Sequence, residues 1–232
     1  MNTIEVPQVR SRTAVDPVPG GTRLPAVLLV CGIGSSILYA AMVAFVAMRW
    51  EGYSSASQTV SELSAIGAPT RPLWVALAGI YTLLVIAFGC GVWLAAGRNR
   101  RLRVVGGLQV ATGLIGPFWP PMHLRGATPT PTDTPHIVFA MAWLVLTLLT
   151  VGFGAAALGR RFRAYSMATL AVFVVFGVLT GVQGPRIAAD LPTPWIGVWE
   201  RVNIGAFLLW VVVLAVALLR GRTAPARQAG TG

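Results

Sequence analysis

Charged residues are scarce in this 232-residue chain, and lysine is absent. Only 11% of the residues are charged and 55% are hydrophobic, whereas a soluble domain typically has about 25% charged residues. The few charges lie between apolar runs, each long enough to cross a hydrocarbon core of roughly 30 Å. This distribution excludes an ordinary soluble domain. Abundant Ala, Gly and Arg without Lys is also typical of coding from a GC-rich bacterial genome.

Cysteine and recognisable catalytic motifs are scarce as well. The two cysteines, Cys31 and Cys90, lie inside apolar runs, which excludes a disulfide framework and a thiolate metal site. The chain has no phosphate-binding glycine loop, no Gly-x-Ser-x-Gly elbow and no His-Glu-x-x-His. We therefore expect no cofactor, and the absence of these motifs favours a role other than catalysis.

The apolar runs predict an all-α membrane bundle, because lipid offers no hydrogen-bond partners to an irregular backbone. We expect six transmembrane helices in one domain over residues 25–219, preceded by a disordered tail over 1–24 and followed by another over 220–232. The predicted spans are 25–48, 72–96, 102–119, 135–158, 164–184 and 197–219.

The arginines predict which way the chain crosses the membrane. Both tails and the turns 97–103 and 159–163 together carry 13 of the 18 arginines. Because positive residues concentrate on the cytoplasmic side, we expect both termini inside and a multi-pass protein of the plasma membrane. These arginines flank apolar runs and form no basic groove, so the net charge of +11 does not predict nucleic-acid binding.

The two histidines fall in or near the second outer loop, together with an acidic residue. His123, Asp133 and His136 could bind zinc or another divalent ion with Glu62 from the first outer loop. The alternative is structural: Asp133 can cap the fourth span, and His123 can be an interfacial residue. We expect no metal, and keep these four residues as the candidate ligands.

Other polar residues could line a ligand pocket on the same face. Ser61 and Glu62 follow Thr59 with capping-box spacing, so that a short surface helix is the alternative to a pocket mouth. Near the last outer loop we expect Arg186, Arg201 and Asn203 to meet other outer groups, since ionisable residues near lipid are costly unless paired. In particular, Glu62, His136 and Arg201 are predicted to converge and share hydrogen bonds. The candidate pocket residues are Ser61, Glu62, His123, Asp133, His136, Arg186, Arg201 and Asn203.

Three stretches resemble a known family. They are the Ser-Glu-Leu-Ser-Ala-Ile-Gly-Ala-Pro segment over 61–69, the Gly-Pro-Phe-Trp-Pro turn over 116–120 with the later His136, and Glu-Arg-Val-Asn-Ile-Gly over 200–205. Together they resemble the integral membrane family catalogued as domain of unknown function 998, over about residues 25–219. The resemblance implies a membrane fold and leaves the activity open.

The leading functional hypothesis is a membrane protein that binds or moves a small or lipid-like ligand through an outer-facing polar pocket. The first alternative is an intramembrane hydrolase, metal-dependent or not, that uses Glu62, His123, Asp133 and His136. The second is an accessory subunit of a membrane complex. The expected partners are the lipid bilayer, such a ligand, and either another membrane protein or a second copy of this chain.

Overall fold

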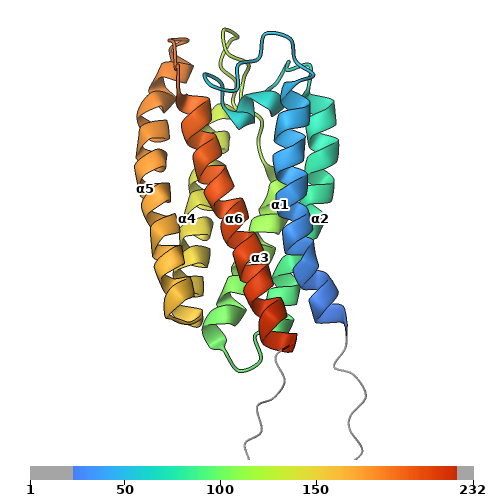
Figure 1. The fold of residues 1–232 in the computed structure, drawn as a ribbon. Helices are drawn as coiled ribbons and strands as arrows, with labels where there is room; N and C mark the ends of the chain where they lie inside the picture. The colour runs from blue at the N-terminus through green and yellow to red at the C-terminus, as the bar shows by residue number, and fades with distance from the viewer. Residues whose placement is uncertain (1–22, 224–232) are drawn as a thin grey trace, which may run out of the picture.

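The computed structural model describes residues 23–223 as a bundle of helices (Figure 1). The six α-helices and two 3₁₀ helices are α1 (Leu24–Ala47), η1 (Val60–Ser64), α2 (Arg71–Ala95), α3 (Arg100–Ile115), η2 (Gly116–Phe118), α4 (Asp133–Ala157), α5 (Arg160–Ala188) and α6 (Ile196–Thr223). No β-strand occurs over this range, only an isolated bridge between Ile66 and His123. The predicted all-α fold is confirmed. The disordered tails predicted over 1–24 and 220–232 lie almost entirely outside the described residues.

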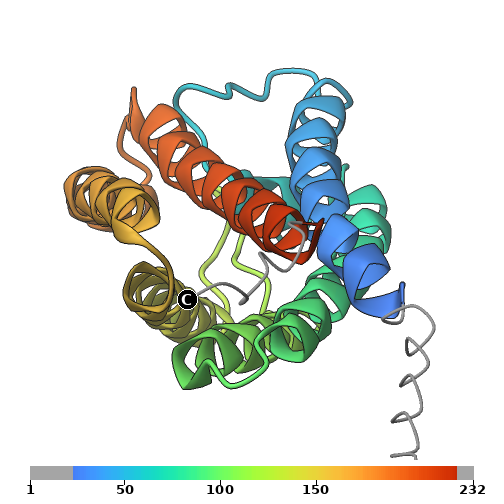
Figure 2. The ribbon, with the colours of Figure 1, turned by 60° about the horizontal axis from the view of Figure 1, so that its bottom comes forward.

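The helices form a ring in chain order. Each helix packs on the next along the chain, and α6 closes the ring against α1, as the view along the bundle shows (Figure 2). Segments 48–70, 119–132 and 189–195 gather at one end, here called the loop end, and the short turns 96–99 and 158–159 lie at the opposite turn end (Figure 1). Short connections bring consecutive helices together as antiparallel neighbours.

Five of the six helices are long and apolar enough to cross a membrane: α1, α2, α4, α5 and α6 up to Gly221. The exception, α3, has 16 residues and begins with Arg100, Arg101 and Arg103. Pro117 contributes to the end of this helix, because it lacks the backbone N–H that an α-helix continuing past Ile115 would need. The predicted span 102–119 is therefore a shorter α-helix, continued by η2 and then by non-helical chain that reaches the loop end.

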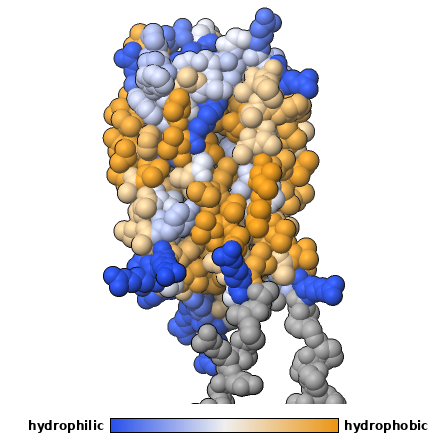
Figure 3. All heavy atoms as spheres, in the orientation of Figure 1, coloured by the Kyte–Doolittle hydropathy of each residue, from blue (hydrophilic) through white to orange (hydrophobic). Residues whose placement is uncertain are grey.

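Charged side chains lie at the two ends of the bundle. An apolar band separates two polar ends on the face shown in Figure 3. At the turn end, Asn99 joins two turns: its amide donates to Ala157 O at 2.9 Å, while its Oδ1 accepts from Leu102 N at 3.1 Å. The close approach of α2 and α3 depends on glycine, since a Cβ on Gly106 would lie 2.8 Å from Gly89 O.

Candidate functional site

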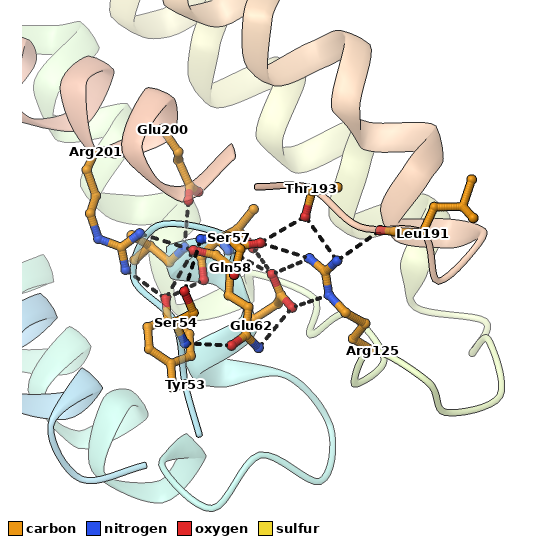
Figure 4. Close-up of polar contacts among 12 residues, drawn as sticks. Tyr53, Ser54, Ser57, Gln58, Glu62, Arg125, Leu191, Thr193, Glu200 and Arg201 are labelled. Atoms are coloured by element: carbon orange, nitrogen blue, oxygen red, sulfur yellow. Dashed lines mark hydrogen bonds and ion pairs between the residues drawn. The ribbon is translucent and has the colours of Figure 1, made fainter. Parts of the chain in front are cut away.

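Glu62 and Arg125 form an ion pair at the loop end (Figure 4). The Glu62 side chain, on η1, is 0% exposed, and that of Arg125 is 19% exposed. Arg125 Nε donates to Glu62 Oε1 at 2.9 Å and NH2 donates to Oε2 at 3.1 Å. Two parallel bonds of this kind fix the relative orientation of the two groups as well as attracting them.

The Glu62 carboxylate also organises its own loop. The backbone amide of Thr59 donates to Oε2 at 2.7 Å, which is the capping interaction that the spacing predicts. The Thr59 hydroxyl donates to the same oxygen at 3.1 Å, and Gln58 Nε2 donates to Oε1 at 3.3 Å. The buried carboxylate therefore has several donors besides the guanidinium, as a buried charge requires.

Arg125 connects Glu62 to the loop that precedes α6. Its NH1 donates to Thr193 Oγ1 at 3.0 Å and to Leu191 O at 3.4 Å. Thr193 in turn donates to Ser57 O at 2.8 Å. One guanidinium thus holds all three long segments of the loop end together, and we call the contacts among Ser57, Glu62, Arg125 and Thr193 the clasp.

Arg125 was not among the predicted site residues. In the sequence it is one of five arginines in the outer segments, and no local motif distinguishes it. The only local signal is Gly126, which has a φ of +77° and allows the chain to turn directly after the arginine. The sequence therefore does not show which of these arginines pairs with Glu62.

Arg201 bonds to backbone carbonyls and a phenol rather than to Glu62. Its NH1 donates to Ser55 O at 2.8 Å and to Gln58 O at 3.1 Å, and its NH2 donates to Tyr53 Oη at 2.7 Å. Gln58 links the two groups indirectly, because its carbonyl accepts from Arg201 while its amide donates to Glu62. The predicted direct bond between Glu62 and Arg201 is wrong.

The neighbouring residues Tyr53 and Glu200 complete the attachment of the first loop to α6. Glu200 Oε2 accepts from Val60 N, the first amide of η1, at 2.6 Å. Tyr53 Oη donates to Thr59 O at 2.7 Å. Burial raises the pKa of Tyr53 to about 12, although the Arg201 guanidinium acts in the opposite direction, so that the phenol keeps its donor proton at neutral pH.

His136 lies in a different environment from Glu62. On the first turn of α4, its Nδ1 lies 2.7 Å from Pro120 O and 3.2 Å from Trp119 Nε1. Its ring packs edge-on against Trp119, with the centroids 5.8 Å apart. The prediction that His136 shares hydrogen bonds with Glu62 and Arg201 is therefore wrong, since its partners belong to the segment that follows α3.

His123 and Asp133 form a third, separate group. Their side chains approach to 2.8 Å between Nδ1 and Oδ2, and the His123 amide donates to Asp133 Oδ1 at 2.7 Å. Asp133 Oδ2 also accepts from Thr130 N at 2.6 Å. Among residues 23–223, no three His, Cys, Asp or Glu side chains come close enough to hold a metal ion. The four candidate ligands Glu62, His123, Asp133 and His136 thus belong to three separate groups of contacts.

The three remaining candidates make other contacts. Arg186 donates from Nε to Pro192 O at 2.9 Å. Asn203, with its amide oriented to suit its neighbours, donates to Val172 O at 3.2 Å and accepts from Gly177 N at 3.0 Å on α5. Ser61 contributes its carbonyl, which accepts from Ser64 Oγ at 3.1 Å. These contacts serve the turn before α6, the α5–α6 packing and η1 respectively.

An open depression of about 400 Å³ lies beside the clasp at the loop end. It is lined by Gly52, Ser54, Ser57, Gln58, Arg125, Pro192, Thr193 and Pro194. None of the eight predicted pocket residues lines it directly, but Glu62 bonds to Arg125 and Gln58 in its wall. Its hydroxyl, amide and guanidinium groups suit a polar ligand.

Comparison with known proteins reveals one relationship. No curated protein and no solved structure matches the chain significantly. Residues 33–217 match a family described as "Protein of unknown function (DUF998)", and this match covers most of the chain and all six helices in whole or in part. The chain therefore belongs to the DUF998 family, as the motifs around Glu62, Trp119 and Arg201 suggest.

Proposed function

We propose that the protein crosses the plasma membrane of a bacterium six times, with both termini in the cytoplasm. In addition to the five long apolar helices, α3 together with η2 would form one crossing. An α-helix of 16 residues and a 3₁₀ helix of 3 residues rise by about 24 Å and about 6 Å, which together match a hydrocarbon core of roughly 30 Å. The arginines at the turn end support its cytoplasmic location.

We further propose that the protein binds or moves a small or lipid-like ligand at the depression beside the clasp. The observation that carries this proposal is the buried Glu62–Arg125 pair, which holds three loops around one polar recess. Ser54 and Ser57 offer hydroxyl groups there and Gln58 offers an amide, whereas the donors of Arg125 and Thr193 already bond within the clasp. A ligand that presents oxygen acceptors, such as a hydroxylated or anionic head group, fits these groups best.

The two alternatives have less support. A hydrolase that uses Glu62, His123, Asp133 and His136 would need them in one place, and they make separate contacts. An accessory subunit needs a partner surface, and nothing in the contacts of residues 23–223 favours one face for that purpose. Both remain as outcomes of the experiment below.

Native mass spectrometry of the full chain, extracted with its lipids, tests the proposal. We expect a bound small molecule or lipid on the wild-type protein, and its loss in Ser57→Phe, which fills the depression while keeping the Ser57 carbonyl in the clasp. Ser61→Phe is the matched control on the same loop, because Ser61 does not line the depression. Retention of the ligand in Ser57→Phe would contradict the proposed site. Stoichiometric metal would favour the hydrolase, and the absence of any ligand would favour the subunit.

A further inference from the structure

A second depression lies at the turn end, far from the clasp. It has a volume of about 480 Å³ and is lined by Leu158, Gly159, Arg160, Arg161, Phe162 and Ala217. The lining residues come from the turn between α4 and α5, the first turn of α5 and the last part of α6. Its walls are mainly carbon, and two arginines border it. It therefore combines an apolar surface with positive charge.

Arg160 and Arg161 differ from two other arginines at this end, Arg101 and Arg163, whose side chains bond to backbone carbonyls. Arg101 donates to Ala156 O at 2.8 Å and Arg163 donates to Ala155 O at 3.3 Å, so both satisfy carbonyls at the end of α4. Arg160 and Arg161 are exposed, and their side chains make no hydrogen bond or ion pair with the described part of the chain. Their guanidinium groups are free to meet an anion.

Within residues 23–223, no acidic residue lies at this end of the bundle. In residues 23–223, every Asp and Glu belongs to a loop-end segment or to a helix turn that begins there. Arg98 and the arginines in the first turns of α3 and α5 therefore create a positive field that no carboxylate in the described part offsets. A positive field at the level where an apolar band ends is the setting in which basic residues attract anionic lipid head groups.

We propose that this depression is a binding site for an anionic glycerophospholipid, with Arg160 and Arg161 on the phosphate and the groove of Phe162 and Ala217 against an acyl chain. Arginine suits this role, because its planar fork can hold two phosphate oxygens while its stem packs on apolar surface. The site is separate from the proposed ligand site at the loop end and does not depend on it.

Native mass spectrometry of the full chain with added phosphatidylglycerol measures the number of lipids retained and their apparent affinity. We expect Arg160→Gln/Arg161→Gln to weaken binding by about 10- to 30-fold, on the scale of two arginines near an anionic surface. The matched control is Arg98→Gln/Arg100→Gln, which removes the same charge from the other turn of this end without touching the depression. We expect the control to bind within about twofold of the wild type. Ala217→Leu, which narrows the apolar groove while keeping every charge, should also weaken binding.

Several results would overturn the proposal. Equal weakening by the two arginine pairs would mean that diffuse surface charge, and not this depression, attracts the lipid. Unchanged binding in Arg160→Gln/Arg161→Gln would exclude the arginines. Equal affinity for zwitterionic phosphatidylethanolamine would show that the site does not require an anionic head group. Equal affinity for soluble glycerol phosphate would show that the acyl chain does not contribute to binding. Circular dichroism and gel filtration identify any variant that fails to fold, and each arginine replaced singly then serves in its place.

Discussion

Glu62 and Arg125 are 63 positions apart in the chain, yet Arg125 Nε donates to Glu62 Oε1 at 2.9 Å with the carboxylate fully buried. This pair joins the loop between α1 and α2 to the segment after α3. Through Thr193 it also joins the segment before α6. Because a buried charge without its partner is costly, the two residues should behave as a unit.

The first prediction follows from this pair. Glu62→Gln and Arg125→Met should each lower the free energy of unfolding by about 3–5 kcal/mol, since each leaves one charge buried and unpaired. The double variant should lose less than the sum of the two. Unfolding in a detergent titration measures all three. Arg186→Gln is the control, with an expected loss within about 1 kcal/mol, because Arg186 lies at an exposed position. Strict additivity would contradict the coupling.

Tyr53→Phe provides the second prediction. It removes the hydroxyl that donates to Thr59 O and accepts from Arg201, which should cost about 1–3 kcal/mol. Because burial raises the Tyr53 pKa from 10.0 to about 12, the folded state favours the protonated phenol. This contribution to stability is complete below pH 10 and is lost as the pH rises toward 12.

The pH dependence is measured as the difference in stability between the wild type and Tyr53→Phe. The advantage of the wild type should be constant between pH 7 and 9 and should shrink above pH 10. Tyr165→Phe controls for tyrosines elsewhere in the chain. An advantage that grows with alkaline pH would show that the phenolate, and not the phenol, is the stabilising form.

The third prediction concerns two hydroxyl groups inside the bundle. Thr147 Oγ1, on α4, is fully buried and lacks a hydrogen-bond partner. Ser166 Oγ, on α5, accepts from Trp210 Nε1 at 2.9 Å. Thr147→Val should therefore be neutral or stabilising, whereas Ser166→Ala should cost about 1–3 kcal/mol by leaving the indole N–H unpaired. Thermal unfolding in detergent distinguishes them. Destabilisation by Thr147→Val would instead indicate a bound water at that hydroxyl.

The fourth prediction tests the helix contacts. A Cβ on Gly106 would lie 2.7 Å from Trp93 N and 2.8 Å from Gly89 O, both on the α2 backbone, which cannot yield as a flexible side chain does. Gly106→Ala should therefore separate α2 from α3 and lower the melting temperature by several degrees. Gly181→Ala, on α5, meets nothing within 4 Å and should be tolerated. Equal effects would contradict this difference in packing.

The fifth prediction concerns membrane orientation. A cysteine at Ala127 should react with an impermeant reagent on intact cells, and one at Arg161 should react only after lysis. Both positions are exposed, at opposite ends of the bundle. Replacing Cys31 and Cys90 with serine removes the background. The opposite labelling pattern would mean that the loop end faces the cytoplasm, and the proposed outer-facing site would then be wrong.

The helices could be predicted from the sequence, but the side-chain contacts at the loop end could not. Apolar runs identify α1, α2 and α4 to within about two residues, since hydropathy and length are local properties. At α5 the prediction ended at 184, but the helix continues through Pro185 to Ala188. At α3 it extended to 119, but the α-helix ends at Ile115. Proline explains part of both differences. Pro185 favours an earlier end of α5 than the structure has, and proline after Ile115 prevents α3 from continuing as an α-helix.

The helical bundle, the segregation of charge to its ends and the capping of η1 by Glu62 follow from the sequence alone. Each depends on residues close together in the chain. The pairing of Glu62 with Arg125, the bonds of Arg201 to carbonyls of the first loop, and the contact of His136 with Pro120 depend on the folded arrangement. Several arginines in the outer segments have the right charge to meet Glu62. The choice among them depends on how the ring of helices brings three distant loops together, because a charge selects its partner by distance and geometry in space.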